Sequence, residues 1–308
     1  MGSGVHEALR QGVPTASKEE TKMQSSNPVF RRSEGFNGRS SGTYPGNGST
    51  QTGYGDPSTW GTGTPGAPAE VGRQTGGGPM TIDTVVQKTG ITLGIVVIVA
   101  TITWFMTGEI DSQAALNTLY MLSMVGALGG FALAMVNSFK KVVSPPLVIA
   151  YAAVQGLFVG AFSKAIESQF GDGDNGLVVG AVVGTFAAVA GTLAAYKFFN
   201  IQVSPKFRKF VIAAMFGFVA LSLFDFVLGF FGASFGVNGF GGLGLIMSVV
   251  GLALGIFMLI LDFDFVERGV AAGLPEVESW RAAFGLTVTI IWIYIELLRI
   301  LAILRGSD

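Results

Sequence analysis

Charged side chains inside long apolar stretches are the residues of this sequence best placed to do chemistry. Five of them lie in the last three such stretches: Asp225, Asp262, Asp264, Glu296 and Arg299. A charge within a membrane span costs several kcal/mol, so such residues usually face a bundle interior or a water-filled path. The sequence therefore predicts that these residues mark an ion or proton path.

Carboxylates from two neighbouring helices could form a switch. On the first helix, Asp262 and Asp264 are two residues apart, so they cannot both point the same way, and only one of them can face the second helix. If Asp262 meets Glu296 in dry surroundings, the two carboxylates can share one proton and change state nearer neutral pH than an exposed acid. Protonated, the pair would bridge two helices. Ionised, it would repel itself and attract a divalent cation such as Ca²⁺.

We therefore predict a proton-controlled latch made by Asp262 and Glu296, which are also the candidate ligands of a transient Ca²⁺. Asp264 is the rival of Asp262, and Asp225 is a secondary candidate. A structural role is the alternative, because Glu296 can simply pair with Arg299 three residues further on. The sequence leaves both interpretations open.

The composition excludes several other kinds of chemistry. The 308 residues include no cysteine, and the one histidine, His6, precedes the apolar part. Thiol catalysis, His-dependent triads and Cys- or His-ligated zinc are thereby excluded from that part. The net charge of −1 offers no basic face for nucleic acid. We expect neither an enzyme nor a nucleic-acid-binding protein, and no resident cofactor.

One short pattern resembles a catalytic motif without its context. Residues 232–236 match G-x-S-x-G, but no histidine is available in the apolar part of the chain to activate Ser234. We interpret this segment as a loop between two spans.

Membrane helices are the elements that must position the charged residues. Half of the residues are hydrophobic and 13% are charged, against about a quarter charged in soluble domains. A helix of about 20 apolar residues crosses the hydrocarbon core of a bilayer. The sequence therefore predicts an all-α polytopic membrane protein, a bundle of seven spans at about residues 85–107, 114–136, 147–165, 176–198, 209–231, 239–265 and 282–304.

Glycines recur inside these spans at small-xxx-small spacing, in the pairs Gly156/Gly160, Gly180/Gly184 and Gly251/Gly255. Small residues let helix backbones approach closely in lipid. We expect close packing within the bundle, with homodimerisation as the alternative.

Two parts of unequal character make up the chain. Residues 1–80 are rich in Gly, Ser, Thr and Pro, with few aliphatic side chains, and are expected to form a disordered cytoplasmic tail. Residues 81–308 form the membrane domain.

The charges of the loops predict the orientation. Lys140 and Lys141 lie in the second loop, and Lys197, Lys206, Arg208 and Lys209 in the fourth, whereas the first and third loops are acidic. Lys and Arg concentrate in cytoplasmic loops. The N-terminus is therefore expected inside the cell, and seven spans then place the C-terminus outside.

The ends of the last two spans carry a family resemblance. The motif LDFDF at residues 261–265, the stretch IYIELLRIL at 293–301 and the opening SNPVFRR at 26–32 resemble the Bax inhibitor-1 family, in its actinobacterial-type branch. The resemblance covers about residues 23–304. It implies a multi-pass protein of the bacterial cytoplasmic membrane that leaks calcium in a pH-sensitive way. It also implies an aspartate pair between the last two helices, at the positions of Asp262, or its rival Asp264, and Glu296.

Two functions follow as expectations. The first is a pH-sensitive leak of Ca²⁺ or another cation, with the lipid bilayer and the ion as partners. The alternative is a non-transporting protein that binds other membrane proteins and modulates proteases or stress responses, which the long tail favours.

Overall fold

The computed structural model describes residues 78–199 and 201–306 of the chain. The described part contains seven helices, each long and apolar enough to cross a membrane. They are α1 (Ile82–Met106), α2 (Gln113–Phe139), α3 (Pro145–Phe170), α4 (Gly176–Phe198), α5 (Pro205–Gly229), α6 (Gly242–Ala271) and α7 (Glu278–Arg305). The predicted all-α, seven-span membrane protein is confirmed. The tail predicted at residues 1–80 lies outside the described residues, except for its last three.

Caps and proline explain where several helices begin. Thr81 and Thr84 form a capping box at the start of α1. α5 begins four residues before the predicted span, because Ser204 accepts a hydrogen bond from the Phe207 amide and Pro205 occupies the first turn. α6 continues to Ala271, six residues beyond the predicted end, and so contains the charged residues that follow the LDFDF motif.

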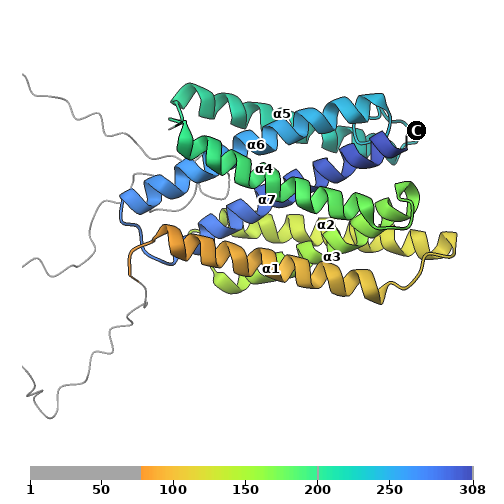
Figure 1. Ribbon diagram of the computed structural model, residues 1–308, viewed down its shortest axis with the longest axis horizontal. Helices are drawn as coiled ribbons and strands as arrows, with labels where there is room; N and C mark the ends of the chain where they lie inside the picture. Colours follow the sequence, from red (N-terminus) through yellow and green to blue (C-terminus); the bar gives the residue numbers. More distant parts are fainter. Residues whose placement is uncertain (1–77, 200, 307–308) are drawn as a thin grey trace, which may run out of the picture.

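α7 is the centre of the bundle. It is the most buried of the seven helices and packs against α1, α3, α4 and α6. Figure 1 shows α5 and α6 along one side and α1, α2 and α3 along the other, with α7 crossing between them. α2 packs on α3, and α5 packs on α6. Residues on α7 can therefore reach most of the other helices.

Hydroxyl groups join α7 to α1. The Thr92 and Thr287 hydroxyls lie 2.7 Å apart in the buried interior, and those of Thr84 and Ser279 lie 2.8 Å apart. Each contact satisfies hydroxyl groups between the two helices, and the Thr92–Thr287 contact does so in the interior, where no water is available. These contacts fix the register of α7 against α1.

A short segment before α1 is bound to the loop between α6 and α7. The Met80 amide donates to the Leu274 carbonyl at 2.6 Å, and the Glu276 amide donates to the Gly78 carbonyl at 3.0 Å. The Lys88 ammonium group lies 2.8 Å from the Glu276 carboxylate. The N-terminal part of the chain thus joins the bundle at this loop.

The predicted close packing at glycines is confirmed for two of the pairs. A Cβ at Gly160 would lie 2.5 Å from the Ala100 carbonyl oxygen, and one at Gly156 would lie 2.7 Å from that of Val96. The backbones of α1 and α3 therefore touch at this point. Gly251 and Gly255 bring α6 equally close to side chains of α7, whereas Gly180 and Gly184 leave room for leucines of α7.

Candidate functional site

Asp262 faces the partner helix α7. Its side chain is 1% exposed, and its Oδ2 accepts a hydrogen bond of 2.6 Å from the Thr289 hydroxyl. Thr289 is itself buried. α6 thus presents a carboxylate to a neutral hydroxyl in the interior of the bundle. Nothing in the sequence singles out Thr289, because a threonine in a membrane helix usually bonds only to its own backbone.

Asp264 points to another side of α6. Its Oδ2 lies 2.7 Å from a guanidinium nitrogen of Arg208, at the start of α5, and its Oδ1 lies 3.0 Å from one of Arg268. The expectation that the two aspartates diverge is therefore met. Because Asp264 bridges two arginines, it ties α5 to α6. Its partners in this structure are the two arginines rather than Glu296, and its role as the rival of Asp262 in the latch stays a prediction.

Glu296 lies further along α7, against the glycine face of α6. A Cβ at Gly251 would lie 2.7 Å from its Oε1, so the carboxylate rests on the α6 backbone. Its Oε2 is 3.4 Å from a nitrogen of Arg299, as the structural interpretation expected. Both side chains are buried. The buried hydroxyl of Ser248 has no hydrogen bond of good geometry among the described residues, although it faces this carboxylate.

The structure does not bring Asp262 and Glu296 into contact. Asp262 meets α7 at Thr289, and Glu296 lies seven residues beyond Thr289 on the same helix. At a rise of 1.5 Å per residue, this spacing is about 10 Å. The antiparallel register of α6 and α7 sets this separation. A latch by direct contact is therefore absent from this conformation, and the two acids are separate positions on one helix interface.

Asp225 and Arg299 hold the loop between α5 and α6. Asp225 lies in the last turns of α5, not at mid-span, and its carboxylate accepts from the amides of Phe235 at 2.7 Å and Asn238 at 2.9 Å. It also accepts from the Ser234 hydroxyl, the residue of the G-x-S-x-G pattern. Arg299 donates to the carbonyls of Val237 and Gly239. In this geometry Asp225 stabilises the conformation of the α5–α6 loop.

A further buried acid escaped the sequence-based prediction because it lies beside a loop. Glu167, near the end of α3, is 5% exposed. Its Oε2 accepts from the Val178 amide in the first turn of α4, at 2.9 Å, whereas its Oε1 has no hydrogen-bond partner among the described residues. Asn175, at the N-cap of α4, makes no side-chain cap bond. Glu167 therefore caps α4 from the neighbouring helix.

No preformed metal centre stands out in the part of the chain that the structure describes. Within it, no group of three or more acidic or histidine side chains is arranged to hold a metal ion. A Ca²⁺ ion between Asp262 and Glu296 would require these helices to move. Transient Ca²⁺ binding at either acid stays a prediction.

The seven-span fold and the acids of its last two helices agree with the comparison to protein families. The sequence model described as Bax inhibitor 1 like matches residues 27–306, which is most of the chain. None of the curated proteins compared with the chain matches it. The match includes all seven helices and every residue of the α6–α7 interface described above, and the chain therefore belongs to the Bax inhibitor 1 like family of membrane proteins.

Proposed function

We propose that this protein mediates a passive, proton-sensitive leak of Ca²⁺ or another cation across the bacterial cytoplasmic membrane. The observation that carries the proposal is the burial of two carboxylates at one interface of membrane helices. Asp262 is 1% exposed and Glu296 is 4% exposed. Acids at such depth are costly, and in membrane proteins they commonly belong to ion paths or proton relays.

Protonation of these acids would control how tightly α6 packs against α7. With the carboxyl groups neutral, Asp262 bonds to Thr289 and Glu296 rests on Gly251, so the interface stays dry. Ionisation of Asp262 places charge in a medium of low dielectric constant, which favours entry of water and separation of the helices, whereas Arg299 lies close enough to offset the charge of an ionised Glu296. Each ionised acid is then an oxygen ligand that a passing Ca²⁺ can use. Flux is expected to increase as the pH rises.

The orientation forms part of the same proposal. The lysines and arginines of the α2–α3 and α4–α5 loops favour a cytoplasmic position for those loops and for the N-terminal tail. Asp262 then belongs to the cytoplasmic half of α6, and Glu296 to the outer half of α7. A cation that crosses along this interface would meet the two acids in succession.

Calcium flux into liposomes tests the proposal. The purified protein is reconstituted with an enclosed calcium-sensitive dye, and flux is measured across a pH series. Asp262→Asn and Glu296→Gln keep the shape of each side chain and remove its ionisation. Each is expected to lower the flux and flatten its dependence on pH.

Asp111→Asn is the matched control, because it removes a carboxylate from the exposed α1–α2 loop. It should retain both the flux and its pH profile. The leak proposal fails if the natural protein conducts no more than empty liposomes. The assignment of the two acids fails if both interior variants behave like the control.

A non-transporting interaction protein is the second candidate. The observation that favours it is the attachment of residues 78–80 to the α6–α7 loop, which links the preceding chain to the interface that holds the buried acids. Deletion of residues 1–77 distinguishes the two candidates. Under the leak proposal the truncated protein still conducts. Under the alternative the truncated protein loses its effect on membrane partners, and neither the full-length nor the truncated protein shows a flux.

A further inference from the structure

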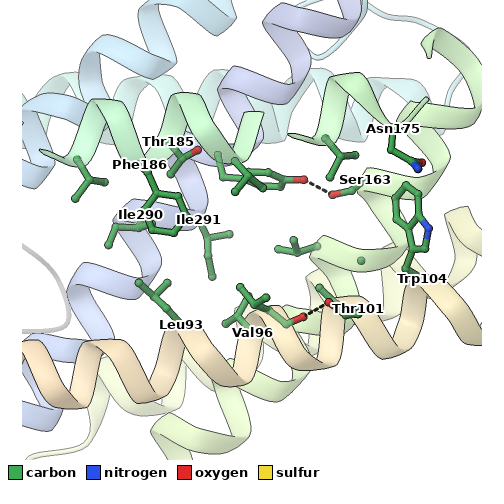
Figure 2. A pocket seen from close by; sticks show the side chains of 18 of the residues that line it. Leu93, Val96, Thr101, Trp104, Ser163, Asn175, Thr185, Phe186, Ile290 and Ile291 are labelled. Atoms are coloured by element: carbon green, nitrogen blue, oxygen red, sulfur yellow. Dashed lines mark hydrogen bonds between the residues drawn. The ribbon is translucent and has the colours of Figure 1, made fainter. Parts of the chain in front are cut away.

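A cavity of about 410 Å³ lies between α1 and α4, with α3 and α7 behind it. Figure 2 shows side chains of α1 and α4 facing each other across it, with Ile290 and Ile291 of α7 between them. Its size is within the range of small-molecule sites. None of the acids of the proposed ion path lines it, so it requires a separate explanation.

The cavity opens sideways from the bundle. The backbones of α1 and α4 stay apart, although both helices pack against α3 and α7. Side chains on its rim are widely exposed, with Val97 at 61% and Phe186 at 69%. Since all four helices are membrane spans, the medium outside this opening is lipid hydrocarbon.

Most of the polar groups in the wall are already satisfied, so the cavity offers little to water. The hydroxyls of Ser163 and Tyr294 lie 2.6 Å apart, and Thr101 and Thr185 donate to carbonyls of their own helices. The remaining wall is formed mainly by Val, Leu, Ile, Ala and Phe side chains. A space of this kind stays dry unless an apolar molecule fills it.

One end of the cavity differs, because hydrogen-bond donors gather there. Figure 2 shows Trp104 and Asn175 together at this end, where α1 finishes and α4 begins. Neither side chain has a hydrogen-bond partner among the described residues. Lys164 lies behind Trp104, with its ammonium group 5.7 Å from the centre of the Trp104 ring; it donates to the carbonyls of Trp104 and Gly108 and to the Thr107 hydroxyl, so it contributes charge rather than a free donor. Donors and a positive charge thus border an apolar groove.

We propose that this groove binds one acyl chain of a membrane phospholipid, with the lipid ester and phosphate groups at the Trp104–Asn175 end. The dimensions fit: the lining of α1 extends from Leu93 to Phe105, about 18 Å at 1.5 Å per residue. One leaflet contributes about half of a hydrocarbon core of about 30 Å. A chain that starts at the membrane boundary, where tryptophan is commonly found, would fill the groove over the depth of its leaflet.

Photo-crosslinking with a phospholipid that carries a diazirine on its acyl chain tests this site. The full-length protein is reconstituted with the probe and irradiated, and the labelled peptides are identified by mass spectrometry. Label is expected to concentrate on the groove residues of α1 and α4. Val97→Trp and Val182→Trp fill the groove and should reduce this label several-fold.

Neighbouring residues give matched controls. Ile98→Trp and Val183→Trp add the same bulk one residue further along the same helices, on exposed positions outside the groove, and should leave the label unchanged. Trp104→Phe removes the indole donor but keeps an aromatic ring, and it should weaken phospholipid retention in native mass spectrometry, with the melting temperature as a check of folding. The proposal is overturned if label spreads evenly around the bundle, if the groove and control variants behave alike, or if a free fatty acid is retained in place of a phospholipid.

Discussion

At the scale of single residues, Asp225 and Asp262 are both buried aspartates of membrane helices, yet their surroundings differ. Asp225 accepts from two backbone amides and a serine of the adjoining loop. Asp262 accepts from a side chain of another helix. A carboxylate that satisfies backbone amides holds a loop in one conformation, whereas one that joins two helices can change how they pack when its charge changes.

Asp225→Ala should destabilise the protein. The substitution leaves the amides of Phe235 and Asn238 without their acceptor, and an unsatisfied buried group costs about 1–3 kcal/mol. Asp225→Asn keeps a carbonyl oxygen as an acceptor and should lose less stability. Melting temperatures in detergent rank the two variants, with Asp111→Ala as the exposed control. Equal melting temperatures for Asp225→Ala and the control would rule out this role for Asp225.

Thr289→Val should loosen the α6–α7 interface without changing the volume of the side chain appreciably. It removes the hydroxyl that donates to Asp262, which costs about 1–3 kcal/mol where no water replaces it. Thr289→Ser keeps the hydroxyl and serves as the control. Melting temperature and basal flux in liposomes report the effect. A valine variant that matches the serine variant in both measurements would show that the hydrogen bond has no part in the interface.

Residue-level contacts were the part least accessible from the sequence. The apolar surroundings of Asp262 and Glu296 are visible in the sequence, and so is the likeness of their stretches to a family. The partner of Asp262 depends on how far α6 slides along α7, and no local pattern encodes that register. The contact of Thr289 with Asp262 therefore could not be predicted from the sequence. The loop conformation that brings backbone amides to Asp225 could not be predicted either.

At the scale of helices, local hydropathy was sufficient to predict all seven spans, because a membrane requires each span to be long and apolar on its own. The ends were less accurate where a helix continues into charged residues. α6 continues past Phe265, and Arg268 in this extension pairs with Asp264 one turn earlier. Glycine spacing correctly predicted close contacts for two of the three pairs, but not which helix each glycine would meet.

Gly160→Ala should separate α1 from α3. The added methyl group would lie 2.5 Å from the Ala100 carbonyl oxygen and 2.8 Å from its Cα, and backbone atoms cannot rotate away. Such overpacking costs about 1–3 kcal/mol. Gly94→Ala on α1 is the control, because nothing lies within 4 Å of its new Cβ. Melting temperatures should fall for the first variant and stay equal or rise slightly for the second. The reverse order would contradict the close contact of these helices.

At the scale of the whole molecule, the arrangement of charge predicts the direction in which the bundle crosses the membrane. Acidic side chains gather at the loops after α1 and α3, and basic ones at the loops after α2 and α4. The proposed order of the two buried acids along the ion path depends on this direction. So does the leaflet from which a phospholipid would enter the groove, since Trp104 lies at the end of α1 that leads into an acidic loop.

Cysteine labelling measures the direction without a background, because the chain contains no cysteine. Asp172→Cys places a thiol in the exposed α3–α4 loop, and Lys206→Cys places one near the start of α5, also at an exposed position. A maleimide that does not cross membranes should label the first variant in intact cells and the second only after the membrane is permeabilised. The natural protein controls for unspecific labelling. Labelling of Lys206→Cys in intact cells would show that the molecule has the opposite orientation. Trp104 would then lie at the cytoplasmic side, and a cation would meet Asp262 and Glu296 in the reverse order.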